Sequence, residues 1–231
     1  MKYIVINTKK YFTEYTFLEF LNNFKEELSL EKTILACNSS FYDLVDNEEI
    51  TLCLQSFDTI SEVQLNNSNI KYSLVGHRDD RIYKSETNQN INHKIKELLN
   101  NGIFPILCVG EEIYDKNIEK TLSTIFVQIN EVLGGLSPKS VQKVFIAYEP
   151  FWAISDGTRY AEIDFNRIGL LIEGINRKFE EIYSINPIIL YGGSVNESNI
   201  EKLNNLEIDG FLIGSASTKN EVLKKIFDSI T

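Results

Sequence analysis

The chain has 231 residues, of which 43% are apolar and 24% charged, so its length suits one large α/β domain or two small ones. Its formal net charge of −10 argues against nucleic acid or an anionic membrane surface as the main partner, because both would repel it. No apolar run has signal-peptide length, and none approaches the roughly 18 residues of a membrane span. We therefore expect a cytoplasmic protein without nucleic-acid or membrane partners, although a small anion held locally remains compatible with this charge.

The cysteine count is odd. Cys37, Cys53 and Cys108 lack the spacing of a metal site, and each lies in or beside an apolar run. We expect three buried, reduced side chains and no metal.

In the first part of the chain, short apolar runs rich in β-branched residues alternate with amphipathic stretches. The apolar residues after Tyr3–Asn7 recur at helical spacing from Phe17 to Leu28, which predicts a strand followed by a helix. The predicted order continues with strand Thr33–Cys37, short helix Ser39–Val45, strand Thr51–Gln55, helix Ile60–Asn67 and strand Lys71–Gly76.

The same alternation continues to the C-terminus. The predicted order is helix Thr87–Asn100, strand Phe104–Gly110, helix Ile118–Leu133, strand Val144–Tyr148, helix Asp164–Tyr183, strand Pro187–Tyr191, helix Glu197–Leu203, strand Gly210–Gly214 and helix Glu221–Ser229. Gly102 and Gly134 are typical of helix ends, and Asp164 is a typical N-cap.

Strands that alternate with helices pair in parallel, because parallel neighbours need a crossover connection. The pattern therefore predicts an α/β protein of eight parallel strands, a (β/α)8 barrel formed by one domain over residues 1–231. An open doubly wound sheet is the alternative.

Functional groups of a barrel gather at the carboxyl ends of its strands. Here Asn7 and Lys9 end the first strand, His77 follows the fourth, Glu111 the fifth and Glu149 the sixth. Pro150 disfavours helical backbone at Glu149 and so holds this carboxylate at its strand end.

Three loops complete the predicted site. The residues Phe151–Gly157 begin with large rings and end with small residues, as a movable lid would. Tyr191–Ser194 and Ile213–Ser217, rich in Gly and Ser, expose backbone N–H groups to an anion after the last two strands, where barrels of this kind usually bind phosphate.

Several motifs together resemble the triosephosphate isomerase family over nearly the whole chain. They are Asn7-Thr8-Lys9, VGH at Val75–His77, PILCVGE at Pro105–Glu111, AYEPFWAI from Ala147, ILYGGSVNESNI from Ile189 and IDGFLIGSAS from Ile208. The resemblance implies a cytoplasmic isomerase of glycolysis and gluconeogenesis whose substrate is a small phosphorylated sugar.

The resemblance also implies roles for individual residues. Glu149 would move a proton between neighbouring carbons through an enediolate, and His77, neutral because it opens a helix, would polarise the carbonyl. Lys9 would supply positive charge and Asn7 would orient the substrate oxygens. No metal or organic cofactor is implied, because side chains suffice for these proton transfers.

The remaining implied residues bind phosphate or support the lid. Backbone N–H groups of Ser155, Ser194, Gly214 and Ser215 would bind the phosphate. The lid and the catalytic side chains would be supported by Asp79, Glu111, Trp152 and Tyr191.

The chain also departs from the family pattern. Where the family has Gly-His-Ser-Glu-Arg-Arg, this sequence reads Gly76-His77-Arg78-Asp79-Asp80-Arg81. The shorter Asp79 is expected to lengthen or lose its contact with Lys9. Arg78 is expected either to lower the pKa of Glu149 or to point outward. The lid carries an additional acidic residue, Asp156.

The largest departure is a shortened loop. Between Gln55 and Ile60 only Ser56–Thr59 remain, where the family has a long loop that docks into a second subunit. We therefore expect a monomer, or a homodimer through another surface, and mobile Asn7, Lys9 and His77. The alternatives are an isomerase of a longer sugar phosphate and a non-catalytic barrel that binds a phosphorylated metabolite.

Overall fold

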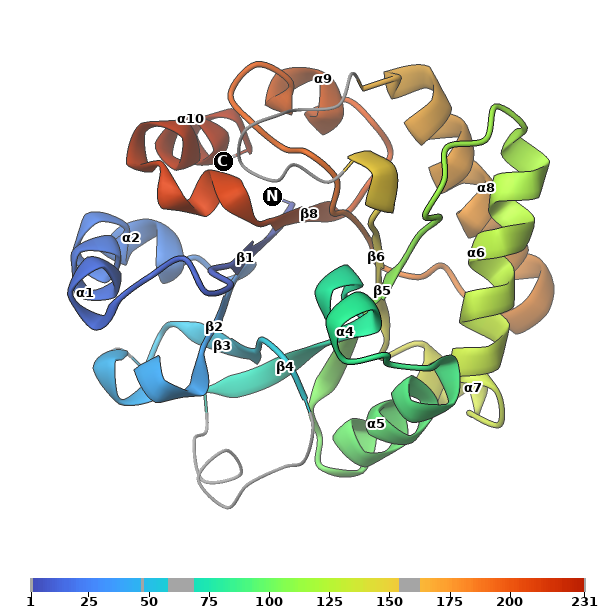
Figure 1. Cartoon of the computed structure of the whole chain (residues 1–231), viewed down its shortest axis with the longest axis horizontal. Coiled ribbons are helices and arrows are strands. Elements are labelled where there is room, and N and C mark those ends of the chain that lie inside the picture. The colour runs from blue at the N-terminus through green and yellow to red at the C-terminus, as the bar shows by residue number, and fades with distance from the viewer. Residues whose placement is uncertain (1, 47, 58–68, 154–162, 231) are drawn as a thin grey trace.

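Eight parallel strands close into a barrel, so that the first strand pairs with both the second and the last. The structure, a computed structural model, describes residues 2–46, 48–57, 69–153 and 163–230 (Figure 1). The strands are β1 (Tyr3–Asn7), β2 (Thr33–Cys37), β3 (Thr51–Leu54), β4 (Ile70–Val75), β5 (Phe104–Val109), β6 (Phe145–Tyr148), β7 (Ile189–Tyr191) and β8 (Gly210–Ile213). The (β/α)8 prediction is confirmed, and the open-sheet alternative is wrong.

Helices surround the strands as a ring in Figure 1. The α-helices of the described residues are α1 (Glu14–Asn23), α2 (Lys25–Leu28), α4 (Arg78–Tyr83), α5 (Asn88–Asn100), α6 (Ile118–Leu133), α7 (Pro138–Val141), α8 (Phe165–Tyr183), α9 (Ile200–Asn204) and α10 (Asn220–Ile230). Short 3₁₀ helices are η1 (Ser39–Leu44), η2 (Phe151–Ala153) and η3 (Ser215–Thr218). The predicted helix Ile60–Asn67 lies outside the described residues.

Most strand residues are apolar because both faces of the strands are largely buried, with Lys71 of β4 as an exposed exception. Alternate side chains point into the barrel, where Val5 lies opposite Ile34 of β2 and Leu212 of β8 within one buried cluster. The intervening side chains, such as Ile4 and Ile6 of β1, join a larger cluster that includes the helices. Cys37, Cys53 and Cys108 are free and buried, as expected.

Local signals explain several helix boundaries. The side chain of Asp164 accepts the backbone N–H of Arg167 and caps α8, as predicted. Gly102, two residues after α5, has a φ of 74°, a conformation that favours glycine. The predicted helix from Phe17 to Leu28 is two helices, α1 and α2, because the backbone at Phe24 leaves the helical region.

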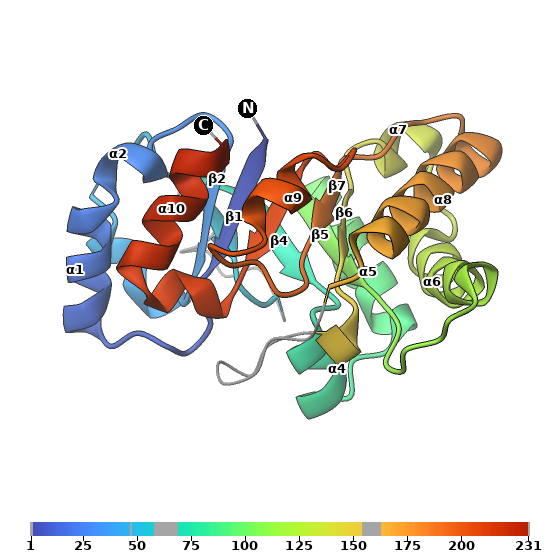
Figure 2. The same ribbon diagram turned by 90° about the horizontal axis from the view of Figure 1, so that it is seen from above.

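All eight strands run in one direction, so their carboxyl ends meet at one end of the barrel. Figure 2 shows α4 at that end and both chain termini at the opposite one. No helix of the described residues is long and apolar enough to cross a membrane.

Candidate active site

The carboxyl end of β1 supplies an amide and an ammonium group. Asn7 is buried, and its Oδ1 accepts the backbone N–H of Lys9 at 3.1 Å. Lys9 has a φ of 48°, which for a residue with a side chain costs on the order of 1 kcal/mol. Its Nζ lies 3.3 Å from Oδ2 of Asp79 on α4. The backbone of Lys9 is therefore strained, and its ammonium group is held in place by the carboxylate of Asp79.

His77 precedes α4 and caps it. Its Nδ1 accepts the backbone N–H of Asp79 at 3.2 Å. A nitrogen that accepts this bond carries no proton, so the neutral ring has its proton on Nε2. Nε2 lies 3.5 Å from Nδ2 of Asn7 and 3.5 Å from Oε1 of Glu149. His77 thus presents an N–H donor to the cavity, between an amide and a carboxylate.

Glu149 follows β6, and its backbone N–H bonds the carbonyl of Val109 at 2.8 Å. Its carboxylate is buried, and Oε2 has no hydrogen-bond partner among the described residues. A Cβ at residue 192 would lie 2.7 Å from Cγ of Glu149, so Gly192 gives the carboxylate its space. A buried carboxylate oxygen without a partner is available to a substrate proton.

Cys108 is the buried neighbour of this carboxylate. Burial first, and the charge of Glu149 second, raise the pKa of the Cys108 thiol well above its usual value. The thiol therefore stays neutral and adds no second negative charge beside Glu149.

One cavity is lined both by Asn7, Lys9 and His77, at the end of β1 and before α4, and by the turns after β7 and β8. Of the predicted site residues, it is lined by Asn7, Lys9, His77, Glu149, Ser194, Gly214 and Ser215. Ser194 is buried, and its Oγ has no partner among the described residues. Ser155, Asp156 and the rest of the predicted lid from Ile154 lie outside the described residues.

Glu111, Trp152 and Tyr191 do not line that cavity, and Glu111 instead joins β5 to β6. Its carboxylate is buried and accepts Nε1–H of Trp152 at 2.9 Å and the hydroxyl of Tyr148 at 3.1 Å. Burial, and next the charge of Glu111, raises the pKa of Tyr148, so its hydroxyl remains a donor. Tyr191 is buried beside Tyr148, with ring centroids 6.3 Å apart.

Arg167 was missed by the sequence reasoning. It is a buried arginine whose Nη2 lies 3.8 Å from Oε1 of Glu111 and 2.9 Å from the hydroxyl oxygen of Thr121. Its guanidinium carbon also lies 4.7 Å from the ring centre of Tyr114. A sequence signal existed, because Arg167 precedes Leu171 and Ile175 by one and two helical turns on the buried face of α8.

The departures at α4 have a structural outcome. Asp79 still reaches Lys9 despite its shorter side chain, with 3.3 Å between Nζ and Oδ2, so of the two expected outcomes, a lengthened or a lost contact, the loss is wrong. The long, flexible lysine side chain accommodates the missing methylene. Arg78 lies 3.7 Å from Oδ1 of Asp79 through Nη1, and its side chain is about one third exposed. Within the part of the chain that the structure describes, no Arg78–Glu149 ion pair is present.

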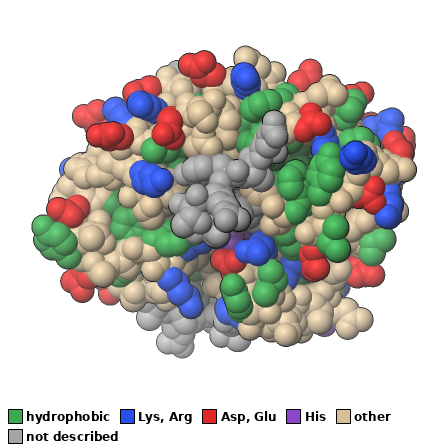
Figure 3. Space-filling view, turned by 45° about the horizontal axis from the view of Figure 1, so that its top comes forward, with side chains coloured by type: hydrophobic (Ala, Val, Ile, Leu, Met, Phe, Trp, Pro, Cys, Tyr) green, Lys and Arg blue, Asp and Glu red, His purple; other side chains and the backbone are tan. Residues whose placement is uncertain are grey.

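The face in Figure 3 intersperses acidic and basic side chains among apolar ones. Among the described residues, no three His, Cys, Asp or Glu side chains are grouped so that they could hold a metal ion. A cavity at the carboxyl ends of eight parallel strands that combines a carboxylate, an imidazole and an ammonium group is typical of the (β/α)8-barrel enzymes.

Comparison with known proteins narrows this class. The family model described as triosephosphate isomerase matches residues 2–230. The triosephosphate isomerase of Dictyoglomus turgidum is 38% identical over 237 residues, covering 94% of this chain and 95% of that protein. That of Ureaplasma parvum is 37% identical over 247 residues, covering 99% of both chains. That of Dictyoglomus thermophilum is 42% identical over 172 residues, covering 74% of this chain and 69% of that protein. The chain belongs to the triosephosphate isomerase family.

Proposed function

We propose that the chain interconverts glyceraldehyde 3-phosphate and dihydroxyacetone phosphate, the reaction of its family, with Glu149 as the base. The observation that carries this proposal is the shared cavity of Lys9, His77 and Glu149 with the turns after β7 and β8. The first three groups suit proton transfer beside a carbonyl, and the turns suit a phosphate.

Glu149 takes a proton from the carbon beside the substrate carbonyl and returns it to the neighbouring carbon. His77 donates its Nε2 proton to the carbonyl oxygen and accepts a proton from the other oxygen, which completes the exchange. Its Nδ1 is already occupied by the backbone N–H of Asp79, so only Nε2 faces the reaction. The intermediate is an enediolate, and the fixed charge of Lys9 stabilises its oxygens.

The phosphate binds to backbone N–H groups of Ser194, Gly214 and Ser215, in the turns after β7 and β8. The Nζ of Lys9 adds a positive charge near this end, since Cε of Lys9 would lie 3.5 Å from a Cβ at residue 214. Ser155, whose structure is not described, remains a predicted fourth contact.

The test is turnover of glyceraldehyde 3-phosphate by the purified protein beside Glu149→Gln and Glu149→Ala. We expect wild-type turnover and a loss on the order of a thousandfold in kcat for both variants. Glu173→Gln, at an exposed glutamate of α8, is the matched control and should keep full activity. An inactive wild type would contradict the proposal, and turnover of tetrose phosphates alone would indicate a longer substrate.

We further propose that the chain folds as one domain and works in the cytoplasm as a monomer, or as a homodimer through a surface other than the family's long loop. Of the shortened loop Ser56–Thr59, the structure describes Ser56 and Phe57. Size exclusion with light scattering tests the assembly. A dimer through this face would contradict the proposal.

A further inference from the structure

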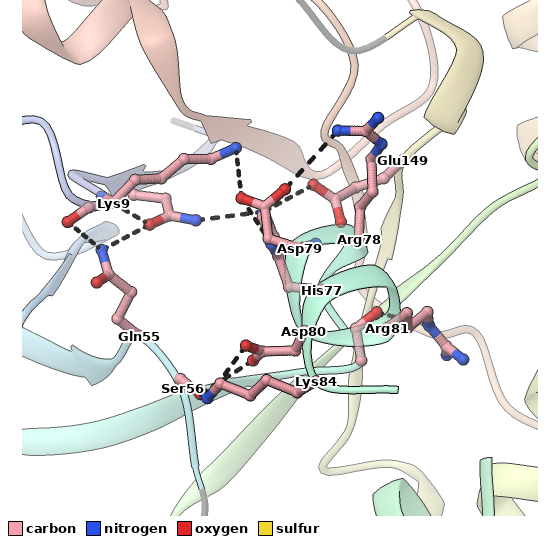
Figure 4. A network of polar contacts seen from close by, with 12 residues as sticks. Lys9, Gln55, Ser56, His77, Arg78, Asp79, Asp80, Arg81, Lys84 and Glu149 are labelled. Atoms are coloured by element: carbon pink, nitrogen blue, oxygen red, sulfur yellow. Dashed lines mark hydrogen bonds and ion pairs between the residues drawn. The ribbon is translucent and has the colours of Figure 1, made fainter. Parts of the chain in front are cut away.

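The two residues that follow β3 contact the end of β1 and the helix α4, which together position Asn7, Lys9 and His77 in the cavity. Gln55 and Ser56 follow directly on Leu54, the last residue of β3. In Figure 4 they lie between Lys9 on one side and, on the other, Asp80 of α4 and Lys84, the residue that follows this helix. Neither was predicted as part of the site.

Gln55 holds the β1 end through a single nitrogen. Its Nε2 donates to Oδ1 of Asn7 at 2.9 Å and to the backbone carbonyl of Lys9 at 3.1 Å. Oδ1 of Asn7 thus accepts two N–H groups, one from Gln55 and one from the backbone of Lys9. These bonds fix the orientation of the Asn7 amide, so that its Nδ2 faces His77 at 3.5 Å.

The bond from Gln55 to the carbonyl of Lys9 also bears on an unfavourable backbone conformation. Lys9 has a positive φ, and such a conformation persists only where surrounding contacts hold it. The direction of the Lys9 side chain follows from this backbone. The position of the Lys9 ammonium group therefore depends on Gln55 as well as on the ion pair with Asp79.

Ser56 holds α4 in the same way. Its Oγ donates to Oδ2 of Asp80 at 2.9 Å and accepts from Nζ of Lys84 at 2.7 Å, while Lys84 and Asp80 pair at 3.2 Å. Asp80 belongs to the first turn of α4, the helix that His77 caps and in which Asp79 meets Lys9. Two polar contacts of Ser56, with Asp80 and with Lys84, therefore hold α4 against the end of β3.

We infer that Gln55 and Ser56 form a brace that positions Lys9, Asn7 and His77 from within the chain. Neither residue of the brace lines the cavity that holds Glu149, so both are positioning residues rather than catalytic ones. Because all contacts of the brace come from the same chain, it needs no second subunit. By this inference Asn7, Lys9 and His77 are held in place, contrary to the expectation that they are mobile. The inference rests on the proposed isomerase function.

The decisive variant is Gln55→Met, which keeps the length of the side chain and removes its N–H donors. We expect kcat to fall at least tenfold, since a misplacement of about 1 Å can cost on the order of a hundredfold in rate, with KM changed less than about threefold. Asn92→Leu is the matched control, because Nδ2 of Asn92 likewise donates two hydrogen bonds, to the backbone carbonyls of Val132 and Gly134, away from the site. It should keep its kcat, even where its melting temperature falls as much as that of Gln55→Met.

A double-mutant cycle separates positioning from general destabilisation. If Gln55 acts largely through Asn7, the loss caused by Gln55→Met shrinks markedly when Asn7→Ala is already present. Ser56→Ala, which removes the α4 half of the brace, should lower kcat by a smaller factor than Gln55→Met.

The inference is overturned if Gln55→Met keeps kcat within twofold of an active wild type, or if it lowers kcat no more than Asn92→Leu does. Failure of the proposed function looks different, because the wild type itself would then lack turnover.

Discussion

Two regions at the carboxyl ends of the strands, the β1–α4 side of the active-site cavity and the Glu111 cluster beside β5 and β6, hold their charged side chains by different means. On the β5–β6 side, the Glu111 and Arg167 side chains are each only 5% exposed, among aromatic rings. On the β1–α4 side, the Lys9 and Asp79 side chains are 17% and 37% exposed, and Asp79 also lies near His77 and Arg78. Burial decides the cost of losing a partner, because a buried charge left alone cannot be hydrated.

Because of this difference, we expect the two regions to contribute unequally to the stability of the fold and to the rate of the reaction. Changes on the β5–β6 side should destabilise the fold, and changes on the β1–α4 side should mainly slow the reaction. The following variants test that division, from the largest expected effect to the smallest.

Arg167→Met is expected to destabilise most. It removes the guanidinium near Glu111 and the bond to Thr121, and leaves a buried carboxylate with fewer partners. We expect a loss of about 3 kcal/mol in the free energy of unfolding. Urea denaturation measures this loss, with Arg177→Met as the control on the same helix, since Arg177 is exposed. A difference of less than about 1 kcal/mol between the two variants would contradict the claim that the buried Arg167 contributes more to stability than an exposed arginine does.

Asp79→Asn should affect stability weakly and kcat strongly. Burial by itself would raise the pKa of Asp79, but the positive charge of Lys9, with a smaller contribution from Arg78, outweighs burial and lowers it. With solvent screening, the ion pair should contribute less than about 1 kcal/mol. Lys9 loses its charged partner, so kcat should fall by about tenfold.

The pH dependence of this variant has a defined sign. A carboxyl whose pKa is lower in the folded state stabilises the fold above its unfolded pKa, and the contribution is lost as the pH falls through the folded value. The stability difference between wild type and Asp79→Asn should therefore be present at neutral pH and shrink below the reference value of 3.8. A difference that grows on acidification would mean that the pKa of Asp79 is raised instead.

Lys120→Ala should have the smallest effect. Its ion pair with Asp115, at 2.6 Å, lies at the surface, where water and salt screen both charges. We expect the melting temperature to stay within about 1 °C of wild type and activity to be unchanged. A larger shift in melting temperature than that of Asp79→Asn would show that the burial of a charged side chain does not determine how much its loss destabilises the fold.

The sequence predicted the strands well, because strands buried on both faces are continuous apolar runs. Most differences are one or two residues at the ends, as in β7, which begins at Ile189 rather than Pro187. The helix α4 lacks apolar periodicity and was implied only by the resemblance of the residues around His77. The helix α7 has only four residues, too few to show a period.

The site was predictable where residues follow strand ends, because parallel strands bring those ends together. The brace was not, since Gln55 reaches Asn7 across a separation of 48 residues, and only the closed barrel sets that distance. Whether Asp79 still reaches Lys9 also depended on the distance between them in the fold, and the residue types alone left open a lengthened or a lost contact.

Exchange of the substrate proton with solvent tests the central claim most directly. Dihydroxyacetone phosphate would be incubated in D2O with wild type or Glu149→Gln, and deuterium at the carbon next to the carbonyl would be followed by NMR. If Glu149 is the base, wild type incorporates deuterium rapidly and Glu149→Gln does so no faster than buffer. Incorporation by Glu149→Gln at the wild-type rate would contradict the account.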